Sequence, residues 1–381
     1  MMRPRLISRR GSVLVIVMVT LLFATVALIT FMEKAGVDLL VEQREAVARR
    51  LRLEAYSAME VALAVLNEFR EANGGLKSPA EGWGDPLAFA GYVPADGRTV
   101  EIALDDESGK LSLPRANVIV LANLFASWGV AKAEAETVAD ALAGWMKHGH
   151  VYSSALRPNY ESAALPYEPP GRPLRSFSEL AAIEGAREFF YDADGRPNDN
   201  WKRFVAAVSL LDFAQPNING AKSDTLAALG QFNPQQQQRL DDFLRGTGEF
   251  QRQGPQWLRN EAEVQRVAGP GGDGRGFAST ISALRITITV RDGRMEFRLS
   301  AVVAPPGGAT TVQATATKAV TTAAAAKSAA ELQARPNAAQ AAAGANTAAK
   351  PAAASLRYPF TLLEIRENDE IPPPPPPPVS P

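Results

Sequence analysis

Hydrophobic positions at the start of the chain form one uninterrupted run, because residues 12–32 include no charged side chain. An apolar segment of about 20 residues is long enough to cross a bilayer as a helix. The pattern then changes into a helical stripe without a break, since residues 13–73 contain no proline. The sequence therefore predicts one continuous helix that ends at Asn73-Gly74-Gly75. Its first half suits lipid and its second half suits a globular body.

Alternation of hydrophobic and polar positions marks half-buried strands further along the chain. Residues 98–104 alternate in this way, as do residues 284–290 and 294–303, which flank Asp292-Gly293. An Asp-Gly pair between two alternating segments is a strong hairpin signal. A last strand-like segment, residues 356–366, is expected to return to the same sheet, because a free apolar strand would tend to aggregate.

Most of the chain between these strands has a helical pattern. Helices are predicted within residues 116–146, 175–190 and 200–212, and a helical pair within residues 225–245. Residues 74–94 are predicted to form an ordered loop and residues 152–175 an extended connection. This order predicts an α+β fold: a long N-terminal helix packed on a small antiparallel sheet, interrupted by a large all-α insertion domain.

The same patterns set the expected domain boundaries. They are a leader (1–11), the transmembrane half of the first helix (12–32), its amphipathic half with the first part of the αβ domain (33–105), the helical insertion (106–280), a β-hairpin (281–304), an Ala/Thr-rich linker (305–355), a further strand (356–366) and a Pro-rich tail (367–381).

Composition excludes some classes of protein. The chain has 381 residues, a formal net charge of −1 and no cysteine. A net charge near zero carries no electrostatic footprint for nucleic acid, so we expect no nucleic-acid partner. Disulfides cannot stabilise the fold in any compartment, and the core must be held by packing alone.

Charges around the first apolar segment predict its orientation. Four arginines precede it: Arg3, Arg5, Arg9 and Arg10. Basic flanks tend to stay in the cytoplasm. We therefore expect a single-pass protein of the inner membrane with its C-terminal bulk in the periplasm.

The N-terminal arrangement resembles a type IV prepilin. The features that carry this resemblance are the basic leader, Gly11, the apolar helix and its amphipathic continuation. The resemblance implies that a prepilin peptidase cuts after Gly11, so that Ser12 begins the mature chain. Most members of that family have a glutamate at the fifth mature position, where this chain has Ile16. An uncharged residue there is typical of the minor pseudopilin K family of type II secretion. It suits a subunit with no neighbour above it, because a carboxylate without a cationic partner is costly in lipid.

Three later motifs, in the same order along the chain, also resemble the pseudopilin K family. They are Asp106-Glu107-Ser108-Gly109-Lys110-Leu111-Ser112-Leu113, then Asp140-Ala141-Leu142 with Trp145, and then Asn217-Ile218-Asn219 before Leu226 and Leu229. We interpret all of them as structural. Asp106, Glu107 and Gly109 suit a turn into the helical insertion, Asn217 and Asn219 suit helix capping, and Trp145 suits a helical core.

The resemblance also implies a role and a set of partners. The role is that of a minor pseudopilin, at the tip of a short pseudopilus, which initiates or caps assembly. The partners are other minor pseudopilins of the I and J type, the major pseudopilin, the prepilin peptidase and the inner membrane. Two alternatives stay open: a signal-anchored periplasmic scaffold or binding protein unrelated to pili, and a DNA-binding helical module of an uptake apparatus.

Metal binding has to be considered because the resemblance implies calcium sites in the helical region of some family members. Calcium needs several oxygen ligands, and one acidic cluster, Asp192, Asp194 and Asp199, has suitable spacing. A solvated Asp-Gly turn is the competing interpretation. His148 and His150 are candidates for a transition metal, but the sequence places no thiolate or carboxylate close to them. No cofactor is otherwise implied.

Enzymatic activity is not expected. The chain has no P-loop, no Gly-x-Ser-x-Gly elbow and no His-Glu-x-x-His motif. With two histidines and no cysteine, few residues could serve as a nucleophile paired with a base.

Overall fold

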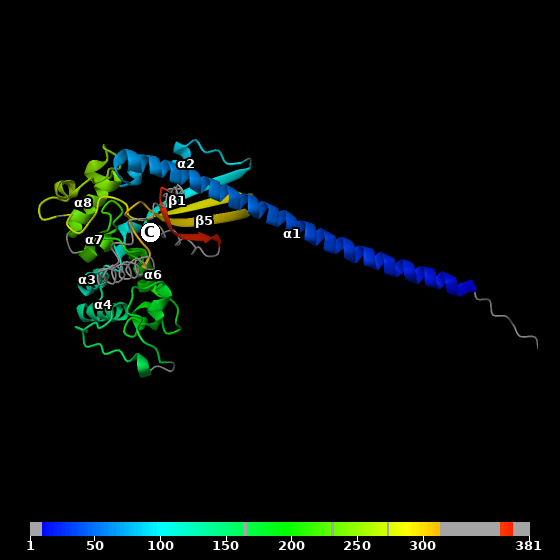
Figure 1. The fold of residues 1–381 in the computed structure, drawn as a ribbon, viewed down its shortest axis with the longest axis horizontal. Coiled ribbons are helices and arrows are strands. Elements are labelled where there is room, and N and C mark those ends of the chain that lie inside the picture. Colours follow the sequence, from blue (N-terminus) through cyan, green and yellow to red (C-terminus); the bar gives the residue numbers. More distant parts are fainter. Residues whose placement is uncertain are drawn as a thin grey trace, which may run out of the picture.

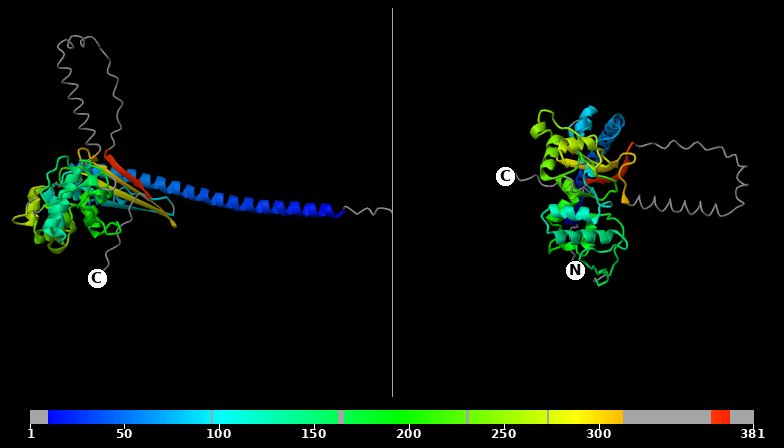
Figure 2. Two further views of the ribbon diagram at one scale, coloured as in Figure 1. Left: turned by 90° about the horizontal axis from the view of Figure 1, so that it is seen from below. Right: turned by 90° about the vertical axis from the view of Figure 1, so that its left-hand side faces the viewer.

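The computed structural model describes residues 10–95, 97–162, 166–229, 232–272, 274–312 and 359–368. Its first element, α1 (Arg10–Asn73), is a single helix of 64 residues that projects far beyond the body (Figures 1 and 2). The prediction of one uninterrupted helix is confirmed. The expectations for most of the leader, most of the Ala/Thr-rich linker and the Pro-rich tail fall outside the described residues.

One antiparallel sheet forms the centre of the body. Its strand order is β1-β4-β5-β6, with β1 at Arg98–Asp106, β4 at Leu284–Asp292, β5 at Met295–Ala304 and β6 at Thr361–Glu367. The β4–β5 turn contains Gly293 with a φ of 59°, a left-handed conformation that favours glycine. The predicted hairpin is confirmed, and so is the return of a C-terminal strand to the sheet.

The second half of α1 covers one face of this sheet (Figure 1). Its buried stripe includes Leu51, Ala55 and Leu66, which pack in one core with Ile286 and Ile288 of β4. Ala55 is completely buried, and a side chain this small lets the helix approach the sheet closely. The helical spacing predicted from the sequence thus places one face of α1 on the sheet.

Strand β6 reaches its neighbour through an unusually long connection. Ala304 at the end of β5 is the register partner of Thr361 at the start of β6, yet residues 305–360 separate them in sequence. Loop-closure entropy grows slowly with loop length, by about 0.6 kcal/mol for each doubling. A connection of this length therefore still allows β6 to pair with β5.

The chain between β1 and β4 forms a region made mostly of helices, below and beside the sheet in Figure 1. Its longer helices, in chain order, are α3 (Val118–Ser127), α4 (Lys132–Met146), α6 (Asp199–Ala207), α7 (Ser223–Leu229), α8 (Pro234–Arg245) and α9 (Glu261–Ala268). One core joins α3, α4 and α6, and a second core joins α7, α8 and α9. The observed architecture is α+β, as predicted.

Five segments differ from the sequence prediction. The predicted helix 200–212 ends at Ala207, because Val208 and Ser209 form β3, which pairs in parallel with β2 (Leu111–Ser112). The helical region is therefore not purely α. The predicted helix 175–190 is a 3-10 turn, η4 (Phe177–Ala182), and a short α5 (Arg187–Phe190). Gly185 lies between them with a φ of 83°, which a helix cannot accommodate.

Two further differences concern segments predicted as loops. The loop 74–94 contains η1 (Pro79–Glu81) and α2 (Pro86–Phe89), which begin after Ser78 and Asp85. A capping residue followed by proline is a helix-start signal. The extended connection 152–175 contains a 3-10 turn, η3 (Tyr160–Ser162). Helix α9 was not predicted at all; its signal is the cap at Asn260.

Candidate functional site

The N-terminal half of α1 is an apolar surface that nothing in the described structure covers. The large hydrophobic side chains from Val13 to Val41 are 43–70% exposed. The described residues include one helix long and apolar enough to span a membrane, with a mean hydropathy of 2.9 in its best window. This half of α1 therefore fits a single-pass membrane anchor.

The expected processing and assembly residues lie at the far end of this helix. Gly11 and Ser12 fall within the first turn of α1, and Ile16 is 60% exposed on its apolar surface. A residue in this position is available to lipid or to a neighbouring helix. The structure does not test the expected roles of Gly11, Ser12 and Ile16, which stay predictions.

The predicted motif residues other than Asp140 and Trp145 meet where β1 turns into the helical region. We call the cluster of Asp106, Ser108, Gly109, Asn217 and Gly220 the β1 junction. Asp106 Oδ1 accepts hydrogen bonds from the Ser108 backbone N–H (2.9 Å) and hydroxyl (2.6 Å). Asn217 Nδ2 donates to Asp106 Oδ2 at 2.7 Å. Two motifs that are far apart in sequence therefore share one carboxylate.

Asn217 also ties the junction to the end of α1. Its Nδ2 donates to the Lys77 carbonyl at 3.0 Å, and its backbone N–H donates to the Ser108 carbonyl at 2.7 Å. The side chain is completely buried. Asn217 was expected to bond its own backbone and cap the following helix. Its Oδ1 does accept a hydrogen bond from the Asn219 backbone N–H at 3.2 Å, but the side chain also links three segments of backbone.

Two glycines let these segments touch. A Cβ added at Gly109 would collide with the backbone of Gly220, and a Cβ added at Gly220 would collide with the Asp106 side chain. Thr225 completes the contact by donating its hydroxyl to the Gly109 carbonyl at 3.1 Å. Gly109 is therefore required by close approach rather than by a left-handed turn conformation.

Burial changes the acidity of the junction carboxylate. Burial raises the pKa of Asp106 from 3.8 to about 6, because its charged form is poorly solvated, although hydrogen bonds from Ser108 and Asn217 act in the opposite direction. Asp105 adds a smaller repulsion. The junction thus holds a carboxyl group that gains protons at mildly acidic pH.

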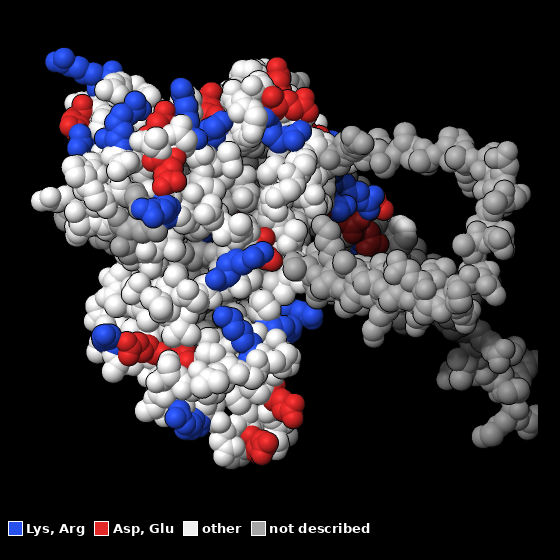
Figure 3. All heavy atoms as spheres, turned by 60° about the vertical axis from the view of Figure 1, so that its left-hand side comes forward, with Lys and Arg blue, Asp and Glu red and all other residues white. Residues whose placement is uncertain are grey.

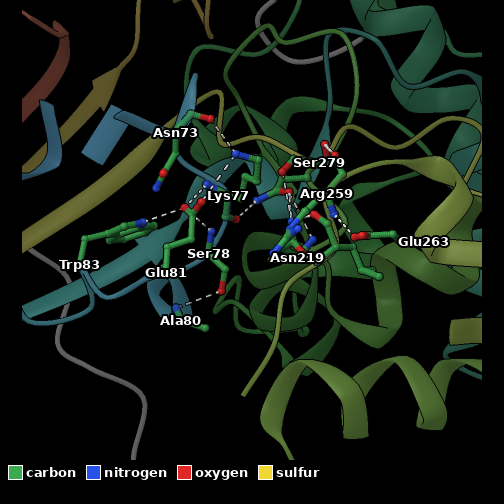
Figure 4. Close-up of polar contacts among 12 residues, drawn as sticks. Asn73, Lys77, Ser78, Ala80, Glu81, Trp83, Asn219, Arg259, Glu263 and Ser279 are labelled. Atoms are coloured by element: carbon green, nitrogen blue, oxygen red, sulfur yellow. Dashed lines mark hydrogen bonds and ion pairs between the residues drawn. The ribbon is translucent and has the colours of Figure 1, made fainter. Parts of the chain in front are cut away.

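Asn219 makes a second link two residues later. Its amide donates to the carbonyls of Leu258 (3.0 Å) and Ser279 (3.1 Å), and its Oδ1 accepts from the Leu258 N–H at 2.7 Å. Figure 4 shows this cluster beside the segment that follows α1, where Glu81 accepts a hydrogen bond from Trp83 Nε1. Asn219 therefore connects the region around α9 to the junction.

Glu107 lies on the sheet side of the same turn. It forms ion pairs with Lys110 (2.9 Å) and Arg285 of β4 (2.6 Å). Burial alone would raise the pKa of Glu107, but the two cations outweigh it and hold the pKa below its usual value. Arg285 also pairs with Glu364 of β6 at 3.3 Å. The motif therefore connects the helical region with β4 and β6.

Asp140 and Trp145 both lie on α4 but serve different contacts. Asp140 is buried and accepts hydrogen bonds from the Ser154 N–H (2.7 Å) and from His150 Nε2 (2.6 Å). Burial would raise the pKa of Asp140, but these hydrogen bonds prevail and lower it. The expectation that no carboxylate lies near His150 is thus wrong. Trp145 is buried in the α3–α4 core, with its ring against Tyr160.

The acidic residues considered for calcium make separate contacts within the protein. Asp192 Oδ1 accepts hydrogen bonds from the backbone N–H groups of Asp194 and Arg196, and so closes its own turn. Asp199 begins α6 and pairs with Lys202. Within the described residues, no group of three or more His, Asp or Glu side chains is arranged to hold a metal ion.

The surface charge is mixed. On the face shown in Figure 3, acidic and basic side chains are interspersed over the helical region and the sheet. On this face the charges do not gather into the one-signed patch that proteins use to attract phosphate backbones.

Sequence reasoning missed several residues that hold these contacts together. Ser108 lies within the first motif and Gly220 directly follows Asn219 of the third motif, so their positions in the sequence were a usable signal. Arg285 and Glu364 carry no local signal, because their pairing depends on the order of strands in the sheet.

One comparison with known proteins covers the first two of the three motifs. Residues 103–193 match the family model for the type II secretion system (T2SS), protein K. No curated protein matches the chain. Among solved structures, the crystal structure of the GspK-GspI-GspJ complex from the enterotoxigenic Escherichia coli type 2 secretion system is similar, with 16% identity and a TM-score of 0.45. That alignment covers 69% of this chain and 93% of that chain.

The fold is an α+β protein in which a helix that fits a membrane anchor packs on an antiparallel sheet, with a helical region inserted between β1 and β4. The match over residues 103–193 confirms the resemblance predicted from the motifs. Over this segment the chain is similar to the type II secretion protein K family.

Proposed function

We propose that this chain is the minor pseudopilin at the tip of a type II secretion pseudopilus, where it initiates or caps assembly. Its part is mechanical rather than catalytic: α1 leaves the membrane and joins a bundle of helices, while the bulky helical region blocks further subunits above it. The expected partners are minor pseudopilins of the I and J type, the major pseudopilin and the prepilin peptidase. The body would lie in the periplasm.

The observation that carries this proposal is Ile16, an uncharged residue on the exposed apolar half of α1. A subunit with another above it benefits from a carboxylate that can meet the neighbour's amino terminus. A subunit with none above would leave such a carboxylate unpaired in an apolar environment, which is costly. Isoleucine at this position avoids that cost, so it supports a terminal place in the filament.

The test is to map the N-terminus of the chain purified from membranes and from sheared pseudopili. We expect cleavage between Gly11 and Ser12, and its loss when Gly11→Asp blocks the peptidase. Immunogold labelling should place the chain at filament ends. An intact Gly11–Ser12 bond would favour the signal-anchored scaffold instead, and labelling along the whole shaft would exclude the tip position.

Ile16→Glu provides the sharper variant, with Leu14→Glu as its matched control on the same apolar helix. Both place a carboxylate in the apolar segment, but only the first restores the fifth-position glutamate. We expect both to reduce the number of pseudopili. Normal assembly with Ile16→Glu would remove the argument from the missing charge.

A further inference from the structure

Strand β6 differs from the other strands in how little of it is buried. In β4, Leu284, Ile286, Ile288 and Val290 are at most 2% exposed. In the described residues 359–368, by contrast, Phe360 is the one buried side chain. Segments with few buried apolar contacts open at lower free energy than the core that supports them. Strand β6 therefore has the properties of a locally unstable element on a stable sheet.

Polar contacts fix β6 to α1 where that helix leaves the body. Glu367 accepts hydrogen bonds from Arg52 Nε and Nη2 at 2.8–3.0 Å and from the Tyr56 hydroxyl at 2.6 Å. The fully buried stripe of α1 begins at Leu51, so these contacts lie where the helix starts to pack on the body. Figures 1 and 2 show β6 at the edge of the sheet, alongside this part of α1.

A second contact holds β6 at its opposite end. The Arg70 guanidinium lies 5.9 Å from the centre of the Phe360 ring, and Phe360 belongs to the same core as α1 and the sheet. Strand β6 thus runs along α1 and holds it at two points, one near the helix end and one near its exit. Between them, Leu362 and Ile365 remain 49% and 42% exposed.

The ion pairs of β6 are themselves partly exposed. The side chains of Arg52 and Glu367 are 56% and 32% exposed, and those of Arg285 and Glu364 are 29% and 31% exposed. Ion pairs in water-accessible positions contribute little free energy. The pairing with β5 is also interrupted by a register shift at Val302/Val303. These contacts give β6 a specific position but hold it weakly.

We propose that Phe360 and β6 form a releasable clasp, which opens while the rest of the sheet stays folded and, when closed, fixes the direction in which α1 leaves the body. Opening removes Glu367 from Arg52 and Tyr56, while α1 keeps its other supports, which include the core it shares with β4 and β5 and the ion pair of Glu54 with Arg98 of β1. The consequence for filament entry rests on the proposed function: the clasp is where the body can change its angle to α1 as the helix passes from a bilayer to a bundle.

Hydrogen exchange of the full chain in detergent tests the local opening. We expect backbone amides of residues 361–367 to exchange at least about 10-fold faster than those of β4. Glu367→Gln should accelerate exchange of β6 by a further factor of about 3, because the substitution removes the carboxylate charge that pairs with Arg52. Glu296→Gln, whose carboxylate pairs with Arg291 within the β4–β5 hairpin, is the matched control and should leave β6 unchanged.

A disulfide can lock the clasp, because the chain contains no native cysteine. Ala301 and Ile365 are register partners across β5 and β6, so Ala301→Cys with Ile365→Cys offers a pair. When this pair is oxidised, exchange of β6 should fall to the rate of β4, and reduction should restore it. Equal exchange of β6 and β4 in the unmodified chain would overturn the local opening.

Distance measurements between spin labels test the effect on α1. Labels at Leu39→Cys on the exposed helix and Ala103→Cys, an exposed position on β1, report the direction of α1 relative to the sheet. We expect Glu367→Gln to broaden the distance distribution, and Glu296→Gln to leave it as in the parent. Faster β6 exchange without broadening would overturn the role in directing α1. Peptidase mapping tests the proposed function separately, so the two can fail independently.

Discussion

The β1 junction and the clasp both join distant segments through a carboxylate, but they differ in exposure. At the junction, Asn217 is completely buried and two glycines bring main chains into contact. At the clasp, Glu367 accepts four hydrogen bonds against three at Asp106, yet its partner Arg52 is mostly exposed. We therefore expect burial, rather than the number of hydrogen bonds, to decide how firmly each joint is held.

The most severe test of this contrast is Gly109→Ala. The added Cβ would meet the backbone of Gly220, which cannot move aside as a side chain can. We expect the free energy of unfolding to fall by more than about 3 kcal/mol, measured by denaturant titration of the purified chain. Gly36→Ala is the control, since nothing lies near the added methyl there. Equal stability of the two variants would show that the main-chain contact is not tight.

A smaller loss is expected for Asn217→Ala. The substitution leaves the Lys77 carbonyl and one oxygen of Asp106 buried without their donor. Unsatisfied buried groups cost about 1–3 kcal/mol, so we expect a loss of about 2–3 kcal/mol in the same titration. Asn123→Ala, which removes an exposed amide, should cost less than about 1 kcal/mol. A cost for Asn217→Ala no larger than that of the control would contradict the bridging role.

The smallest expected effect is a difference in pH dependence between the two joints. Burial raises the pKa of Asp106 to about 6, so the folded state binds more protons than the unfolded state between pH values of about 4 and 6. Its contribution to stability therefore declines as the pH rises through that window, by on the order of 2 kcal/mol. Comparing the unfolding free energy of the parent with that of Asp106→Asn across this window isolates the contribution of the Asp106 carboxyl group.

At the clasp the sign is opposite. Hydrogen bonds from Arg52 and Tyr56 hold the pKa of Glu367 below its usual value, so its contribution is present at neutral pH and is lost as the pH falls through the lowered pKa. Hydrogen exchange of β6, corrected for the intrinsic pH dependence, should therefore accelerate in acid while the junction is strengthened. A parallel response of both joints would contradict the assignment of the two carboxylates.

Periodicity in the sequence predicted the elements that depend on local pattern. The whole of α1, the β4–β5 hairpin around Gly293 and the return of β6 all follow from hydrophobic spacing and turn residues. The predicted helix 200–212 was too long because β3 is defined by its pairing with β2, a contact that no local pattern reveals. Long-range pairing, rather than propensity, set that boundary.

The candidate site was predicted in part. The motifs identified Asp106, Gly109 and Asn217, and the structure brings them together. Their contacts were not predictable, because capping and bridging use the same asparagine chemistry. The pairing of His150 with Asp140 was missed for a similar reason: the two residues are ten positions apart, and only the fold turns the chain back on itself.

The length of α1 gives small motions at the body a large effect elsewhere. From Leu51, where the sheet first supports the helix, to its beginning at Arg10 is roughly 60 Å at 1.5 Å per residue. A tilt of about 5° at that fulcrum would carry the far tip sideways by roughly 5 Å, about the rise of one helical turn. A small change in the angle between the body and α1 would therefore become a large displacement of the membrane end of the helix.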